Sequence, residues 1–293
     1  MFIAGIDGGG THTRLELRDD QNRLLSRQEF GPFNINSIGE EAFRSLLRQV
    51  FAACGDMEEC RKICFGAAGI SNPRMGEILK EELKNAGFSG KWKLCGDQEI
   101  ALRGAMDGPG VAVIAGTGSI CFGKNAAGDT ARSGGYGHLI DDGGSGYALG
   151  RDVLSAAVRA IDGRSKDRAI LEVVYARLGG SVPGDIVSFV YSPDTDKSAI
   201  AQYSHIALNL AEAGNGEAQA ILETGAAELH ALVKAVQEKL EIETCPIALL
   251  GGLISEDNIY RRTVAAKLGE LGTVLAPKHD ALWGAAQMAW ELE

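Results

Sequence analysis

The chain has 293 residues, of which 45% are apolar and 23% charged, and its formal net charge is −10 with a pI near 5.1. This length suits two globular domains, and such a chain buries enough surface to fold without disulfides or a structural metal. The acidic balance argues against nucleic acid or an anionic membrane as a partner. No apolar run has the length of a membrane span, and we expect a cytoplasmic protein.

Six cysteines are spread along the chain without any C-x-x-C pair. Three of them stand in apolar runs that resemble strands, so we expect reduced and mostly buried thiols, as in a cytoplasmic protein. A metal site is the alternative for the closely spaced Cys54, Cys60 and Cys64. No histidine lies near them in the sequence, which argues against that alternative.

The first part of the chain alternates between strand and helix patterns. Short apolar or alternating runs predict strands at residues 2–6, around 15–17, and at 24–30, 62–68 and 92–95. Apolar residues at helical spacing predict helices over 40–51, 76–86 and 97–105. The first strand ends at Asp7 and runs into three consecutive glycines.

The opening pattern recurs roughly 110 residues later, a spacing that favours a duplicated domain over a repeat array. The second part has predicted strands at residues 111–115, 120–122, 246–250 and 273–275. Helical spacing extends over 197–240, and a closing helix is predicted over 281–292. We therefore expect an α/β protein of two similar halves, one formed by 1–107 with 280–293 and the other by 108–279.

Two glycine-rich turns, one in each half, are candidate phosphate loops: Asp7-Gly8-Gly9-Gly10-Thr11-His12-Thr13 and Gly116-Thr117-Gly118-Ser119. Glycine lets main-chain N–H groups approach phosphate oxygens, and threonine or serine hydroxyls add donors. The alternative is that both are ordinary hairpin turns, which favour glycine anyway. The carboxylate of Asp7 suits Mg²⁺ beside phosphates, and it equally suits a turn former. Neither the P-loop pattern nor the dinucleotide-fold pattern is present.

At these turns the chain resembles the acetate-kinase/sugar-kinase/Hsp70/actin superfamily. It is most similar to the N-acetylglucosamine kinase branch, which is grouped with the BadF/BadG/BcrA/BcrD ATPase family. Further segments resemble that branch along the whole chain: Gly31-Pro32-Phe33-Asn34 with Gly39, Gly134-Gly135-Tyr136-Gly137-His138, Asp142-Gly143-Gly144-Ser145-Gly146-Tyr147, Gly251-Gly252 and Gly284-Ala285. The resemblance implies two RNase H-like halves of the actin/hexokinase type with ATP in the cleft between them.

The resemblance also implies roles for individual residues, with ATP and Mg²⁺ as cofactors and Asp7 at the metal. Residues implied to bind ATP are Gly8, Gly9, Gly10, Thr11, Thr13, Gly116, Thr117, Gly118 and Ser119, with Gly251 and Gly252 on the adenosine side. Residues implied to bind the sugar are Asn34, Asp97, Gly135, Tyr136 and Asp142. We expect a homodimer that acts on a small molecule.

Asp97 follows a predicted strand and opens a predicted helix, a position that by itself favours a helix N-cap. Capping would keep its carboxylate ionised, as a general base requires. In the resembling family the aspartate at this place is the catalytic base, so we expect Asp97 to accept the proton of the sugar hydroxyl.

The sequence departs from the family pattern next to Asp142. Gly143 stands where the family usually has glutamate, and Asp141 stands where it commonly has glycine, which puts the sugar preference in doubt. Tyr136 replaces a tryptophan and keeps an aromatic ring. We interpret His138 as a structural hydrogen-bonding residue and His12 as a variable surface residue.

The sequence thus predicts an ATP-dependent kinase that phosphorylates N-acetylglucosamine or glucosamine at the 6-hydroxyl, with N-acetylmuramic acid as a larger candidate substrate. One alternative is an ATPase that activates a 2-hydroxyacyl-CoA dehydratase or benzoyl-CoA reductase. Those relatives hold an iron–sulfur cluster between subunits, and the Cys-Ala-Ala-Gly-Thr-Gly type of segment is missing here. Another alternative is a nucleotide- or sugar-binding sensor without turnover, although no helix-turn-helix extension is evident.

Overall fold

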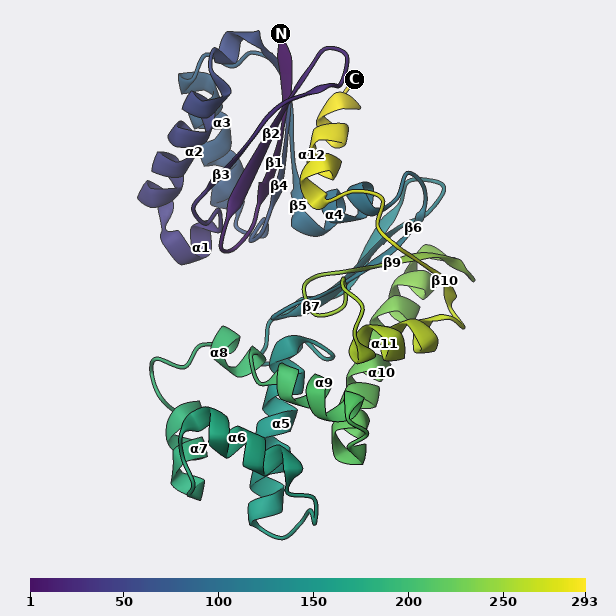
Figure 1. Cartoon of the computed structure of the whole chain (residues 1–293). Helices are drawn as coiled ribbons and strands as arrows, with labels where there is room; N and C mark the ends of the chain where they lie inside the picture. The colour runs from purple at the N-terminus through teal and green to yellow at the C-terminus, as the bar shows by residue number, and fades with distance from the viewer. The chain divides into compact units, whose positions relative to one another are not determined.

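The computed structural model describes residues 1–293 and divides into two compact units, Met1–Gly108 with Pro277–Glu293, and Pro109–Ala276 (Figure 1). Each unit is built on one five-stranded mixed sheet with helices packed against it. None of the helices is long and apolar enough to span a membrane.

In the first unit the strand order is β3-β2-β1-β4-β5. Three antiparallel strands form a meander, and β4 and β5 add to β1 in parallel. The strands are β1 (Phe2–Gly8), β2 (Thr13–Asp19), β3 (Leu24–Phe30), β4 (Cys60–Ala67) and β5 (Lys91–Gly96). Because β1, β4 and β5 are parallel, their carboxyl ends meet at one edge of the sheet, where ligands of α/β folds bind.

Helices cover both faces of this first sheet (Figure 1). The helical segments are α1 (Ile35–Ile38), α2 (Glu40–Cys54), a 3₁₀ turn (Met57–Glu59), α3 (Pro73–Asn85), α4 (Asp97–Ala105) and α12 (Ala281–Trp290). The closing helix α12 packs on β1 and α4 with almost no space between the backbones. A Cβ atom on Gly5 would lie 2.3 Å from the Ala286 nitrogen, and one on Gly284 would lie 2.0 Å from the Ile100 carbonyl oxygen. Small residues at these contacts let the last helix complete the first unit.

In the second unit the strand order is β10-β9-β6-β7-β8. The strands are β6 (Gly110–Ala115), β7 (Ser119–Lys124), β8 (Thr130–Gly134), β9 (Cys245–Leu250) and β10 (Gly272–Leu275). Again a three-stranded antiparallel meander is extended by two parallel strands. The two sheets share one topology, as expected for a duplicated domain.

The second unit carries more helix than the first. Its helices are α5 (Gly146–Ile161), α6 (Ala169–Leu178), α7 (Pro183–Val190), α8 (Lys197–Ala201), α9 (Ser204–Glu212), α10 (Gly216–Leu240) and α11 (Ile259–Leu268). Helix α10 packs on the sheet, whereas α5 to α9 pack mainly on one another (Figure 1). One large apolar core joins this helical layer to the strands.

Two parts of the sequence-based prediction need correction in the second unit. The helical stretch predicted over 197–240 is three helices, and the break between the last two arises because Gly214 has a left-handed φ of +87° and Asn215 caps the next helix. Strand β8 and helices α5, α6, α7 and α11 were not predicted. Helix α5 begins inside a glycine-rich motif, and glycine at positions 146 and 150 weakens the helical signal.

All six cysteines are buried and none forms a disulfide, in agreement with the prediction of buried thiols. No group of three or more histidine, cysteine, aspartate or glutamate side chains is arranged to hold a metal ion. The alternative of a metal site at Cys54, Cys60 and Cys64 is therefore wrong.

Candidate nucleotide and sugar site

The turn between β1 and β2 presents free backbone donors. The Gly9 amide donates to the His12 carbonyl oxygen at 2.9 Å, which closes the turn. The three amides within it, those of Gly10, Thr11 and His12, make no hydrogen bond inside the protein, and all three residues are exposed. A concave set of unpaired N–H groups is a binding element for anions such as phosphate.

The base of this turn is fixed to the segment that follows β3. A Cβ atom on Gly8 would lie 2.4 Å from the ring of Phe33, so only glycine fits there. The Phe33 amide donates to the Gly9 carbonyl oxygen at 3.0 Å. The Thr13 hydroxyl is fully buried and donates to the Gly31 carbonyl oxygen at 2.6 Å. Thr13, predicted to bind ATP, thus joins the β1–β2 turn to the predicted sugar loop.

Asn34 caps helix α1 and belongs to a cluster of three asparagines. Its Oδ1 accepts from the Asn36 amide at 3.0 Å, and the Asn72 Nδ2 donates to the Asn36 Oδ1 at 2.8 Å. Gly69 lies against this cluster: its φ is +77°, and a Cβ atom there would lie 2.6 Å from the Asn34 Oδ1. Asn34 is the one member of this cluster that was predicted as a site residue. Asn72 had a local signal, because Asn-Pro is typical of a helix start.

Asp97 is the first residue of α4, and the N-cap is Gly96, one residue earlier. The interpretation of Asp97 as the cap is therefore wrong: the Gly96 amide donates to the Glu99 Oε1 at 3.1 Å. Asp97 is open to solvent, but protein atoms crowd its carboxylate, and this desolvation raises its pKa. A hydrogen bond from the Gln98 amide opposes the shift, and the charge of Asp7 adds to it. The helix start therefore does not give this carboxylate a lowered pKa.

Asp7 faces Arg14 across the antiparallel β1–β2 pair, and the two side chains form an ion pair. Arg14 also lies 4.0 Å from the carboxylate of Asp280, and Arg27 lies 3.5 Å from the same carboxylate. Arg27 is in turn paired with the fully buried Glu16. Arg14 was not predicted as a site residue, because its position depends on strand register and not on any motif.

The turn between β6 and β7 sits on the amino end of helix α5. The Gly146 amide donates to the Gly116 carbonyl oxygen at 2.8 Å, and the Tyr147 amide donates to the Thr117 carbonyl oxygen at 3.2 Å. The amides of Thr117 and Gly118 make no hydrogen bond inside the protein. They are free donors close to the positive end of a 16-residue helix, a favourable place for an anion.

Asp142 lies against this second turn. It is a non-glycine residue with a positive φ of 63°, and it is 5% exposed. Its Oδ1 accepts from the Ser119 amide at 3.3 Å, and the Ser119 hydroxyl donates to the Gly143 carbonyl oxygen at 2.8 Å. A Cβ atom on Gly118 would lie 2.9 Å from the Asp142 Oδ2. The buried carboxylate thus fixes the shape of the β6–β7 turn.

Gly143, the departure from the family pattern, adjoins a carboxylate from another element. A Cβ atom at position 143 would lie 2.9 Å from the Oε2 of Glu228, which is on α10. A glutamate at position 143 would lie against the Glu228 carboxylate, and the two negative charges would repel each other. Glycine at 143 avoids this repulsion. Asp141 has a separate role, because its Oδ2 accepts from the Tyr136 amide at 3.2 Å.

Gly135 and Tyr136 belong to an exposed loop after β8. Gly135 has a φ of +76°, and the ring of Tyr136 is 63% exposed with the Arg132 guanidinium 5.0 Å from its centroid. His138 packs edge-on against Tyr147, with 4.7 Å between ring centroids. His138 therefore makes a packing contact, and no hydrogen bond is found for its ring.

Gly251 and Gly252 follow β9, next to the end of β6. The φ of Gly251 is +89°, and a Cβ atom there would lie 2.4 Å from the Ala115 carbonyl oxygen. The same oxygen accepts from the Leu253 amide at 3.1 Å. The glycine pair and the turn that begins at Gly116 thus share one edge of the second sheet.

Each unit therefore gathers its predicted site residues at the carboxyl edge of its own parallel strands. The first unit brings together the β1–β2 turn, the asparagine cluster and Asp97. The second brings together the β6–β7 turn, Asp142 and the glycine pair. Free amides that can bind phosphate oxygens and a carboxylate that can accept a proton from a hydroxyl are groups used in phosphoryl transfer.

The model of the BadF/BadG/BcrA/BcrD ATPase family matches residues 4–289. An N-acetylmuramic acid/N-acetylglucosamine kinase of Clostridium acetobutylicum is 31% identical, with 98% of each chain covered. An N-acetyl-D-glucosamine kinase of Dictyostelium discoideum is 30% identical, with 99% of this chain and 97% of the relative covered.

Solved structures share the fold over the full length. A protein of Chromobacterium violaceum, described provisionally as an N-acetylglucosamine kinase, superposes with a TM-score of 0.80 at 24% identity and 98% coverage of both chains. A ROK family glucokinase of Streptomyces griseus gives a TM-score of 0.59 at 16% identity and 100% coverage of both. The predicted actin/hexokinase-type fold is confirmed.

Proposed function

This chain belongs to the BadF/BadG/BcrA/BcrD ATPase family, and we propose that it is an ATP-dependent kinase that phosphorylates N-acetylglucosamine or glucosamine at the 6-hydroxyl. Both curated relatives are named as kinases of N-acetylated amino sugars, which supports the predicted activity. One observation carries the proposal. The two sheets have the same topology, and each has, at the equivalent place, a turn whose backbone amides are free.

On the acceptor side, Asp97 is the proposed general base. It accepts the proton of the 6-hydroxyl as the oxygen bonds to the γ-phosphorus of ATP, and ADP leaves. A pKa raised by desolvation suits this step, because a base works best when its pKa approaches the working pH. Asn34, Gly135, Tyr136 and Asp142 are the remaining proposed sugar contacts. Asp142 also accepts a hydrogen bond from the Ser119 amide, and this contact stabilises the β6–β7 turn.

On the donor side, the two turns are proposed to hold the phosphates through their free amides, with Gly251 and Gly252 beside the adenosine. Arg14 adds a positive charge at the base of the first turn, next to Asp7. The donor set also fits Mg²⁺, because this ion keeps several waters and needs only one or two carboxylates beside ATP phosphates. Asp7, whose side chain is 13% exposed, is the carboxylate proposed to hold it. Bound there, Mg²⁺ would neutralise phosphate charge.

We also propose a cytoplasmic homodimer. Six buried thiols without a disulfide support a reducing compartment. Light scattering on the purified protein tests the dimer: a mass near twice 30.9 kDa supports it, and a mass of one chain contradicts it.

A kinetic panel tests the proposed activity. Purified protein is given Mg-ATP with glucosamine, N-acetylglucosamine, N-acetylmuramic acid or glucose, and ADP release is followed in a coupled assay. We expect sugar-dependent ADP release with at least one amino sugar and little with glucose. ADP release that no sugar stimulates would instead favour an ATPase, and an absence of turnover despite nucleotide binding would favour a sensor.

A further inference from the structure

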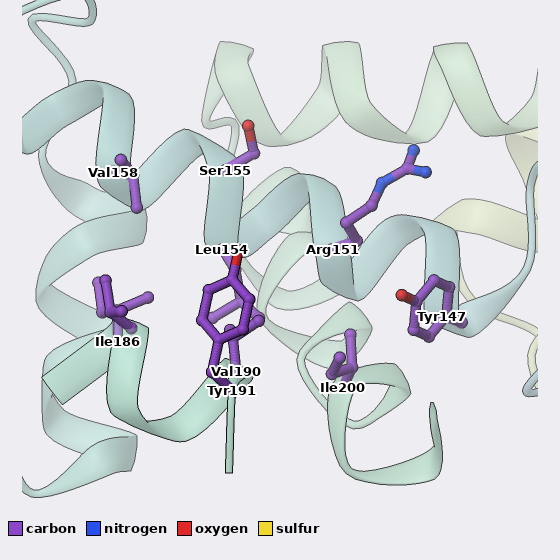
Figure 2. A pocket seen from close by; sticks show the side chains of 10 residues that line it. Tyr147, Arg151, Leu154, Ser155, Val158, Ile186, Val190, Tyr191 and Ile200 are labelled. Atoms are coloured by element: carbon purple, nitrogen blue, oxygen red, sulfur yellow. The ribbon is translucent and has the colours of Figure 1, made fainter. Parts of the chain in front are cut away.

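The second unit holds a pocket of about 310 Å³ between helices α5, α7 and α8 (Figure 2). Most of its lining is aliphatic, and its one charged side chain, Arg151, is already paired with the neighbouring Asp152 at 2.8 Å. This pocket therefore offers no charged group that is free to recognise a ligand. The first unit, by contrast, has a row of charged side chains that ends at Asp7, the carboxylate proposed to hold Mg²⁺.

These charged side chains lie on one face of the β1–β2–β3 meander. Asp7 stands directly opposite Arg14, and Glu16 stands opposite both Gly5 and Arg27. Because opposed residues of antiparallel strands point to the same side of the sheet, all of them share the face of Gly5. A Cβ atom on Gly5 would meet the backbone of α12, so this is the face on which α12 packs (Figure 1).

Carboxylates and guanidiniums alternate along this face. The Arg27 Nη2 lies 2.6 Å from the Oε2 of the fully buried Glu16, and its Nη1 lies 3.5 Å from the Asp280 Oδ2. The same Asp280 oxygen lies 4.0 Å from the Arg14 Nη1, and Arg14 is ion-paired with Asp7. Asp280 thus lies between two guanidiniums, whereas Asp7, at the end of the row, is paired with Arg14 alone.

A small movement lets Arg14 change partners. The side chains of Arg14 and Asp280 are 41% and 39% exposed, whereas that of Asp7 is 13% exposed. Shortening the 4.0 Å contact to an ordinary hydrogen bond needs a shift of only about 1 Å. Glu29 also stands opposite Arg14, but it already has a partner in His12, with 2.9 Å between its Oε1 and the His12 Nδ1. Asp280 is therefore the carboxylate to which Arg14 can move.

We propose that Arg14 competes with Mg²⁺ for the Asp7 carboxylate, and that Asp280 receives the Arg14 guanidinium when the metal ion binds. This proposal rests on the proposed nucleotide site and adds a control of its metal affinity. A guanidinium and a metal ion both need the Asp7 oxygens and repel each other, so each lowers the affinity of the other. Without nucleotide, Arg14 neutralises the partly buried Asp7. With Mg-ATP bound, Asp280 stabilises the displaced guanidinium and so makes the exchange favourable.

Calorimetry on the intact chain tests the proposal without turnover. The dissociation constant of a non-hydrolysable ATP analogue is measured in EDTA and in saturating Mg²⁺. The ratio of the two values is the metal coupling, the factor by which Mg²⁺ strengthens nucleotide binding.

Two variants and a matched control are compared with wild type. Arg14→Gln removes the competing cation. Asp280→Asn removes the charge of the second position and keeps a side-chain oxygen to cap α12. Arg23→Gln is the control, because Arg23 is an exposed arginine paired with Asp19 at the opposite end of β2.

The two variants should change the metal coupling in opposite directions. Arg14→Gln should raise it roughly two- to fivefold, the range expected for one partly exposed ion pair, because Asp7 is then free. Asp280→Asn should lower it by a similar factor, because Arg14 then stays on Asp7. In the double variant the Asp280 change should have no effect, since no competing guanidinium is left. Arg23→Gln should match wild type, and retained binding of the analogue shows that each variant is folded.

Three results would overturn the proposal. A coupling that Arg14→Gln lowers or leaves unchanged would show that Arg14 does not compete with the metal ion. A loss in Asp280→Asn that persists in the double variant would show that Asp280 acts through its own charge and not through Arg14. A wild-type coupling of one would remove the metal from this site altogether. The proposed kinase activity is tested separately: opposite shifts in the two variants, with no turnover on any sugar, would overturn the kinase and support the exchange of Arg14.

Discussion

The carboxylate of Asp97 lies among groups that work against its ionisation. Desolvation and the nearby Asp7 both raise its pKa, and backbone hydrogen bonds from the amides of Gln98 and of Asp97 itself oppose the shift. If this carboxylate is the base, Asp97→Asn should retain nucleotide binding and lower kcat roughly 10²–10⁴-fold. The measurement is kcat with N-acetylglucosamine beside ATP affinity from calorimetry. A variant with wild-type kcat would remove Asp97 from the chemistry.

The same pKa predicts how activity depends on pH. The base must be ionised, so kcat/KM for the sugar should fall as pH drops through the pKa of Asp97 in the free enzyme. Because this pKa is raised above the ordinary value near 3.9, the acidic limb should lie at higher pH than for an exposed aspartate. A pH–rate profile with N-acetylglucosamine measures this. An acidic limb at the ordinary aspartate value would contradict the assignment.

The raised pKa also affects stability. The folded state binds the Asp97 proton more tightly than the unfolded state, so ionised Asp97 destabilises the fold above its folded pKa, and this cost fades as pH falls below it. Asp97→Asn removes the charge and should raise Tm at neutral pH, with a difference that shrinks toward acidic pH. Thermal melts of both proteins at several pH values test this. A lower Tm for the variant at neutral pH would show that the carboxylate stabilises the fold.

At the scale of elements, Asn72 links the loop after β4 to the sugar loop and also caps α3. Two substitutions distinguish the hydrogen bond to Asn36 from the capping of α3. Asn72→Asp keeps the capping oxygen and loses the donor to Asn36, so we expect a sugar KM raised several-fold with little change in Tm. Asn72→Ala loses both and should also lose about 1 kcal/mol of stability.

The measurement for Asn72 is sugar KM and kcat beside Tm for both variants. Because Asn72 acts through Asn36 on the position of Asn34, the effect should appear in KM for the sugar and not in KM for ATP. Unchanged sugar KM in Asn72→Asp would show that the asparagine cluster only supports the loop.

The contact between α4 and α12 depends on the absence of side chains. Gly284→Ala would place a methyl group 2.0 Å from the Ile100 carbonyl oxygen, and overpacking of this kind costs roughly 1–3 kcal/mol. Gly184→Ala, on α7 with open space around it, is the matched control and should be neutral or slightly stabilising. Denaturant unfolding measures both. Equal stability of the two variants would contradict close packing of the last helix on the first unit.

Features set by local sequence patterns could be predicted from the sequence, whereas features set by contacts between distant segments could not. Both glycine-rich turns, all the strands of the first unit and the position of Asp97 after β5 follow from short runs with strong local patterns. Arg14, Asn36 and Glu228 were missed, because each gains its place from strand register or from an element far away in the sequence. Helix α5 was missed because its glycines, which the packing of α8 requires, weaken its helical pattern.

At the scale of the whole molecule, two units with one sheet topology each contribute a turn with free amides. This symmetry explains why the family and the fold could be predicted from motifs spread over the full chain. The alternative of a dehydratase activator is less consistent with the structure, because a cluster held between subunits needs exposed cysteines and all six are buried.

The most direct test of the central claim is product analysis of one reaction. The protein is incubated with Mg-ATP and N-acetylglucosamine, ADP is quantified, and the sugar product is examined by phosphorus and proton NMR. The account predicts one sugar phosphate for each ADP, with the phosphate on the 6-hydroxyl, and roughly 10²–10⁴-fold less product from Asp97→Asn over the same time. ADP formed without a sugar phosphate, or a sugar phosphate formed equally by Asp97→Asn, would contradict it.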